Sequence, residues 1–167
     1  AFLVANTGER LVSSSSQLIS TIAWRIGGRV TFAIEGSILS AGSIVKWLRD
    51  ALGLIARSEE IEALAASVTD SGGVHLIPAF TGLGAPYWDP DARAALLGLT
   101  PASGRAEIAR AALESVVYQT CDLVDALTQD AVAPALLKVD GGMARNSLFC
   151  QILADMLDLP VLRPRME

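Results

Sequence analysis

Asp140, Gly141 and Gly142 form a turn whose residue types suit the binding of a ligand through the backbone. The turn follows an apolar run and precedes a segment with helical periodicity, which places it at a strand-to-helix junction. Glycine lets a ligand approach the main chain closely, and a helix start offers free N–H groups and partial positive charge. A second interpretation stays open, in which Asp140 caps the helix and the two glycines only make the turn.

Gly42 is a second candidate, because it interrupts a helical pattern at a cost of about 1 kcal/mol relative to alanine. A flat ligand, or its sugar, lying against bare backbone explains a glycine at this position. Close packing between two helices is the alternative explanation, and the residue by itself favours it.

The loop of residues 81–90 is rich in glycine, proline and aromatic residues. It lacks the Gly-Lys-Ser/Thr ending and the strand–turn–helix setting of the known phosphate-binding loops. Asp89 and Asp91 are either cation ligands or turn residues. His75 is interpreted as structural, and nothing pairs it with a nucleophilic Ser or Cys, so no catalytic residue and no metal ligand is assigned in this chain.

A framework of strands and helices must position these turns. Gly27-Gly28 between two alternating apolar runs predicts a tight hairpin, the second and third of three antiparallel strands. From residue 37 the apolar period changes to about 3.6, which predicts a helix that ends near Gly53. The expected strands cover residues 2–6, 21–25, 29–34, 74–78, 93–99, 135–139 and 161–162, and the expected helices begin near residues 37, 58, 103 and 148.

The longest of these helices carries polar residues at spacings of three and four from Glu107 to Gln129 and apolar residues on the opposite side. This pattern predicts a surface helix that packs on a sheet. The compact apolar run at 135–139 predicts a buried strand. The order of elements is typical of an α/β fold with a mixed sheet and flanking helices.

Composition and charge argue against several partners. The net charge of -5, without a basic stripe, argues against nucleic acid. No run approaches the roughly 20 apolar residues that a spanning helix needs, so no membrane partner is expected. Cys121 and Cys150 favour buried thiols in a reducing cytoplasm, with an intramolecular disulfide as the alternative. The chain opens on Ala1 without an initiator Met, in what reads as the middle of a strand, and closes on a short strand with nothing after it, so we expect a piece of a longer protein. The opening residues show no signal-peptide pattern.

Several long motifs in order resemble the FGGY carbohydrate kinase family over essentially the whole chain. They lie at residues 34–37, 41–42, 46–50, 80–90, 94–114 and 139–146. The resemblance implies an actin-like ATPase (ribonuclease H-like) fold. Residues 1–167 would then form a single truncated domain, the C-terminal nucleotide-binding domain, whose N-terminal partner domain is absent from this chain.

The resemblance also implies a function and the residues that serve it. ATP would donate a phosphoryl group to a hydroxyl of glycerol, leaving ADP, and Mg would be held by phosphates, water and acidic residues upstream of this chain. Gly42, Lys46, Gly142 and Asn146 match nucleotide-binding positions, although many members that act on glycerol carry Gln where Lys46 stands. Phe2 matches the aromatic residue that packs on the glycerol carbons. The catalytic aspartate lies upstream, so the chain alone is expected to be inactive.

Two other functions stay open. One is a family member that phosphorylates another sugar or sugar acid, namely xylulose, ribulose or gluconate, because the main specificity residues lie upstream. The other is a member that has lost catalysis and serves as a nucleotide-binding or regulatory module. A homo-oligomer is compatible with either.

Overall fold

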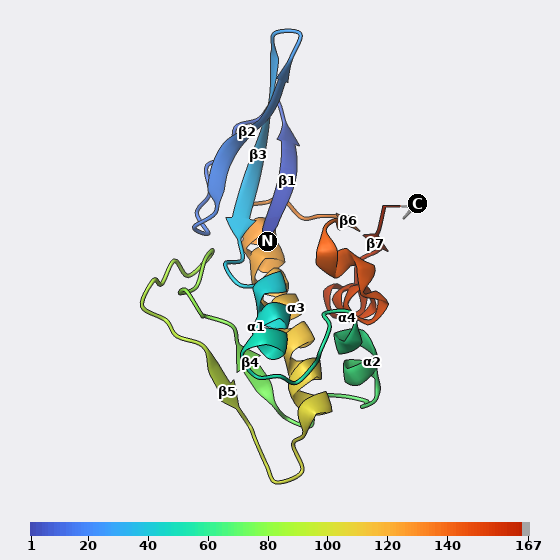
Figure 1. Cartoon of the computed structure of the whole chain (residues 1–167). Coiled ribbons are helices and arrows are strands. Elements are labelled where there is room, and N and C mark those ends of the chain that lie inside the picture. Colours follow the sequence, from blue (N-terminus) through green and yellow to red (C-terminus); the bar gives the residue numbers. More distant parts are fainter. Residues whose placement is uncertain (165–167) are drawn as a thin grey trace.

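The N-terminal segment of the chain, residues 2–37, forms a three-stranded antiparallel sheet with the order β1-β3-β2 (Figure 1). The hairpin between β2 (Ile19–Ile26) and β3 (Arg29–Ser37) turns at Gly27 and Gly28, whose φ angles are 56° and 81°. This confirms the predicted hairpin, since these φ values favour glycine. β1 (Phe2–Gly8) pairs with the other edge of β3, and the hairpin tip extends well beyond the helices.

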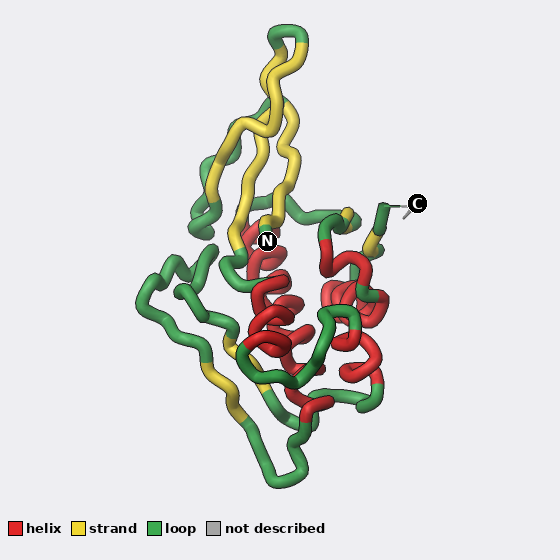
Figure 2. The backbone as a smooth tube through the Cα atoms, in the orientation of Figure 1, coloured by secondary structure: helices red, strands yellow, loops and turns green. Residues whose placement is uncertain are grey.

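The computed structural model describes residues 1–164, in which helices and short strands follow this sheet (Figure 2). These elements are α1 (Gly42–Asp50), α2 (Glu60–Ala66), β4 (His75–Ile77), β5 (Ala95–Leu97), α3 (Arg105–Gln129), β6 (Leu137–Lys138), the 3-10 helix η1 (Gly142–Arg145), α4 (Ser147–Leu157) and β7 (Val161–Leu162). Within the described residues, no helix combines the length and the apolar character needed to cross a membrane.

The long helix α3 is the centre of the molecule, which corrects the predicted surface helix. It contacts α1, α2, α4, β1 and β4. Glu114, a member of the polar stripe, is only 7% exposed and pairs with Arg110 at 2.6 Å between Oε1 and Nε. Helices pack on α3 from several sides, so Glu114 is buried together with the apolar stripe, whereas Tyr118, Asp125 and Gln129 of the polar stripe are exposed.

The described strands form three separate small sheets rather than one continuous mixed sheet. β4 pairs with β5 in antiparallel fashion, and β6 pairs with β7 in parallel. The predicted buried strand at 135–139 is wrong in its extent, because β6 has two residues and only Leu137 is buried. The segment is exposed because, among the described strands, β6 pairs only with β7, and residues 136–139 line an open cleft.

The first helix also ends earlier than predicted. α1 stops at Asp50, and Leu52, which fits the apolar stripe, is 44% exposed. Gly53 then turns with a φ of 62°. The cysteines are both free, Cys121 half-buried and Cys150 buried, so the disulfide alternative is not realised.

The loop at residues 80–90 is held by close packing against the end of β3 and by hydrogen bonds within the loop. A Cβ atom on Gly84 would lie 2.1 Å from the carbonyl oxygen of Ser37, so this glycine allows the loop to meet the end of β3. Asp89 accepts hydrogen bonds from the backbone N–H groups of Asp91 and Ala92 at 2.9 and 3.0 Å. These contacts support the interpretation of Asp89 as a turn residue.

Candidate functional site

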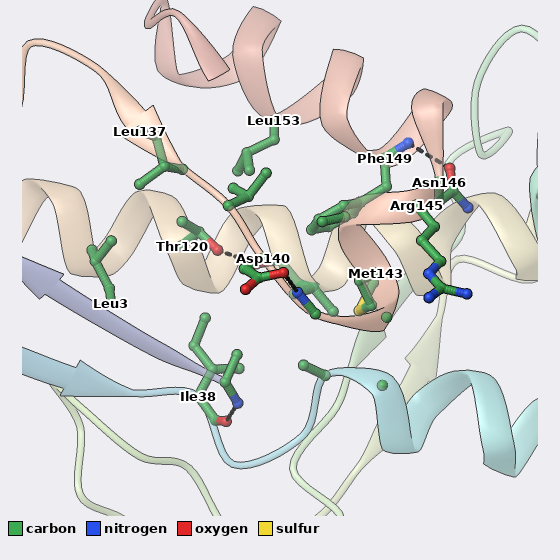
Figure 3. Close-up of a pocket in the computed structure, with 18 of the residues that line it drawn as sticks. Leu3, Ile38, Thr120, Leu137, Asp140, Met143, Arg145, Asn146, Phe149 and Leu153 are labelled. Atoms are coloured by element: carbon green, nitrogen blue, oxygen red, sulfur yellow. Dashed lines mark hydrogen bonds between the residues drawn. The ribbon is translucent and has the colours of Figure 1, made fainter. Parts of the chain in front are cut away.

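The residues predicted to contact nucleotide and substrate line one cleft of about 1670 Å³ between the sheet, α1 and the segment from β6 to α4. Gly42 and Lys46 come from α1, Gly142 from η1, Asn146 from the residue before α4, and Phe2 from the start of β1. Figure 3 shows the β6-to-α4 segment, with Asp140, Met143, Arg145 and Asn146 following one another along its rim. Five residues that are spread over 145 positions of the sequence therefore line the same cleft.

Gly42 begins α1 with its backbone facing open space. A Cβ atom built on Gly42 would have no atom within 4 Å. Close packing between helices therefore does not require this glycine, and that alternative fails. Lys46 lies one helical turn later, on the same side of α1, and is exposed at the cleft.

The Asp140–Gly142 turn leaves a second stretch of bare backbone. Gly141 has a φ of 92°, and the Asp140 carboxylate accepts the Gly141 N–H at 2.6 Å. Gly142, like Gly42, has no atom within 4 Å of a built Cβ. Asp140 thus orders the turn itself, and the alternative in which it caps the following helix is wrong.

Asn146 caps α4 instead. Its Oδ1 accepts the Phe149 N–H at 2.8 Å, as drawn in Figure 3. Because this oxygen is engaged, the amide group presents Nδ2 with its two N–H donors. An N-cap residue has a fixed place relative to its helix, so Asn146 is ordered before any ligand arrives.

Glu62 is a residue of the site that the sequence reasoning missed. Its Oε1 accepts the N–H groups of Ser147 and Leu148, at 2.9 and 3.2 Å. In the sequence, Glu62 only suggests a favourable charge near the start of its own helix, α2. The contact spans 85 residues, and no local pattern predicts it.

The cleft combines apolar walls with charges of both signs. Leu3, Ile38, Met143 and Phe149 supply apolar surface. The charged lining residues are Lys46, Lys138, Arg145 and Arg163 on the basic side and Glu59, Glu62 and Asp140 on the acidic side. Such a cleft suits a flat, partly apolar molecule that carries negative charge.

The described lining residues offer poor chemistry for catalysis. The Thr120 hydroxyl donates to the carbonyl oxygen of Val116 at 2.7 Å, and Ser58 accepts from Arg49 at 3.1 Å. Among residues 1–164, no group of three or more His, Cys, Asp or Glu side chains is placed to hold a metal ion. Phe2 is 73% exposed at the cleft and contributes an aromatic surface. The arrangement fits binding better than bond cleavage.

Comparison with known sequences matches this chain to carbohydrate kinases. Residues 3–167 match the C-terminal domain of the FGGY family of carbohydrate kinases. The glycerol kinase of Rhodospirillum centenum is 58% identical over 163 residues, which cover 98% of this chain and 33% of that protein. The glycerol kinase of Alkalilimnicola ehrlichii is 56% identical over 165 residues, with the same shares covered. This chain thus spans about a third of the length of these relatives.

Solved structures show the same fold. The crystal structure of Plasmodium falciparum glycerol kinase with ADP is 37% identical and aligns over 99% of this chain and 33% of that chain, with a TM-score of 0.91. A xylulose kinase from Brucella ovis shares the fold at a TM-score of 0.87 and 23% identity. The predicted α/β class, an actin-like ATPase domain, is confirmed.

Proposed function

This chain belongs to the FGGY family of carbohydrate kinases, and we propose that it forms the nucleotide-binding side of an enzyme that transfers a phosphoryl group from ATP to glycerol. The observation that carries the proposal is the bare backbone at Gly42 and at Gly142, both on the lining of one cleft. Packing does not explain either gap, whereas a flat base or a ribose ring would fill both.

The neighbouring side chains fit the rest of a nucleotide. The Nδ2 group of Asn146 is a hydrogen-bond donor for the base or the ribose. The Lys46 ammonium lies one turn from Gly42 and is a mobile positive charge for the ribose or a phosphate. The resemblance implies Gln at this position in many family members that act on glycerol, and Lys46 would change this contact from an amide to a cation.

The reaction itself needs parts outside this chain. Phosphoryl transfer requires an in-line arrangement, a divalent cation on the phosphates and a residue that positions the attacking hydroxyl. Magnesium would neutralise the phosphate charge, held by the phosphates, water and acidic residues elsewhere in the whole protein. The proposed role of residues 1–167 is therefore that of one truncated domain, opposite an N-terminal domain that supplies the catalytic base.

Glycerol is the proposed acceptor because the glycerol kinase relatives are the most similar in sequence among those described above. Phe2 would pack on the glycerol carbons from the edge of the cleft. A three-carbon polyol offers little apolar surface, so an exposed aromatic ring is a suitable partner for its CH groups. The two free thiols agree with a reducing cytoplasm as the place of action.

The test is ADP release by the whole protein with glycerol, xylulose, ribulose, gluconate or no acceptor. We expect ADP release that depends on ATP, magnesium and glycerol. Release with another acceptor would keep the reaction and overturn the substrate. ADP binding without release on any acceptor would favour a non-catalytic module, and absence of ADP binding would overturn the proposal entirely.

A further inference from the structure

The first turn of α4 has its backbone donors satisfied from two different sources. A helix start leaves four N–H groups without partners inside the helix. Asn146 accepts the N–H of Phe149 at 2.8 Å, a local cap. Glu62 accepts the N–H groups of Ser147 and Leu148 at 2.9 and 3.2 Å, and it comes from α2.

The carboxylate of Glu62 is well placed for this role. Ile61 and Ala65 are buried and anchor α2 in the core, and Glu62 between them is half-buried. A carboxylate that accepts backbone N–H groups at a helix N-terminus gains from hydrogen bonding and from the helix dipole. Within residues 1–164, Glu62 forms no ion pair with Lys or Arg, so its hydrogen bonds serve α4.

Glu62 thereby determines where the rim of the cleft lies. Asn146 immediately precedes Ser147, and η1 connects it to the Asp140–Gly142 turn. A shift of the first turn of α4 would move Asn146 and, through η1, Gly142. Arg163 adds a weaker restraint from the other side, donating from Nη1 to Ser147 Oγ at 3.1 Å.

We propose that Glu62 is a positioning residue for the nucleotide, which it holds indirectly by fixing α4 and with it Asn146 and Gly142. The inference rests on the proposed function.

Two variants of the whole protein test this role. In Glu62→Ala we expect the KM for ATP and the Kd for ADP to rise about tenfold, with kcat and the KM for glycerol within about twofold of wild type. Glu62→Gln keeps an amide oxygen as acceptor, so its KM for ATP should rise by no more than about threefold. A purely structural role would instead lower the folded fraction, and thus kcat, while leaving KM unchanged.

Glu60→Ala is the matched control on the same helix. Glu60 accepts the Ala56 N–H at 3.0 Å and pairs with Arg57, and these contacts stay within its own segment. The substitution removes the same charge and disturbs the start of α2 without reaching α4. We expect unchanged nucleotide affinity.

Amide hydrogen exchange separates the outcomes. Faster exchange at Ser147 and Leu148 in Glu62→Ala, together with weaker ADP binding, supports the inference. Faster exchange with unchanged ADP affinity overturns it and leaves a structural cap, and unchanged exchange overturns the contact itself. If wild-type protein binds no ADP, the proposed function fails and this inference with it. If the wild-type and Glu62→Ala proteins bind ADP equally well, the proposed function stands and the inference alone is overturned.

Discussion

Glycine serves two opposite purposes in this chain, and the space around each residue distinguishes them. At Gly84 and Gly98 a Cβ atom would lie 2.1 and 2.0 Å from a backbone oxygen, so these residues permit close contact between segments. At Gly42 and Gly142 a Cβ atom would meet nothing within 4 Å. The first pair allows close packing within the fold, whereas the second pair faces open space on the lining of the cleft, where we propose that the nucleotide lies.

Gly42→Ala is expected to weaken ADP binding without lowering stability. A methyl group added where the nucleotide packs against the backbone costs about 1–3 kcal/mol of binding free energy, which corresponds to roughly a five- to 150-fold rise in Kd. The free energy of unfolding should stay the same or rise by up to about 1 kcal/mol, because alanine favours the helix. Titration calorimetry of the whole protein measures the Kd for ADP, and urea unfolding measures its stability. A loss of stability with unchanged ADP affinity would contradict the proposal that the nucleotide packs against Gly42.

Gly84→Ala should behave in the reverse manner. Its methyl group would overlap the Ser37 carbonyl, and backbone atoms cannot rotate away as a flexible side chain can. We expect a loss of roughly 1–3 kcal/mol or more in the free energy of unfolding. In the fraction that remains folded, ADP affinity should equal that of wild type. A loss of ADP affinity without a loss of stability would contradict this prediction and indicate that the loop takes part in binding.

At the scale of elements, a turn of serines joins the N-terminal sheet to the C-terminal end of α3. Asp130, the residue after α3, accepts the Ser15 N–H at 2.8 Å and the hydroxyl groups of Ser14, Ser15 and Ser16. Partial burial acts to raise the pKa of Asp130, but the hydrogen bonds from these serines outweigh it and hold the pKa below its usual value. The ionised carboxylate therefore contributes to stability.

The contribution of Asp130 has a defined pH dependence. A folded-state pKa below the unfolded one means that the stabilisation is fully present above about pH 4 and is lost as the pH falls through the lower, folded value. Asp130→Asn should unfold more readily than wild type at neutral pH and should lose less stability between pH 5 and pH 2. Urea unfolding midpoints measured across this pH range test the prediction. If the midpoints of the two proteins change with pH in parallel, the hydrogen bonds from the serines do not depend on the charge of Asp130.

The same elements show how far local sequence patterns reach. Gly27-Gly28 predicts its hairpin because the turn requires backbone angles that glycine adopts readily. The period of α3 predicts its length, but not that its polar stripe is partly buried, since the packing of α2 and α4 is not encoded in the helix alone. The short β6 and the Glu62 contact were unpredictable for the same reason: each depends on a partner far along the chain. Gly42, Gly142 and Asn146 became candidates for nucleotide binding through long motifs, not through spacing.

At the scale of the whole molecule, residues 1–164 line a cleft that we propose as one wall of a nucleotide site, and no group of three or more His, Cys, Asp or Glu side chains among these residues is placed to hold a metal ion. We therefore expect the isolated chain of 167 residues to show no ADP release that depends on glycerol. The whole protein should show such release under the same conditions. A coupled assay on equal molar amounts of the two makes the comparison, and turnover by the isolated chain would place the missing catalytic group within it.

The bond between Glu62 and the start of α4 closes a loop of 85 residues. Contacts so distant in sequence form late, because the entropy of closing the loop must be overcome first. A nucleotide site that depends on this contact would exist only after the chain through Leu148 has been synthesised and folded. During translation or refolding, the onset of ADP binding would then mark the completion of the domain rather than of any single helix.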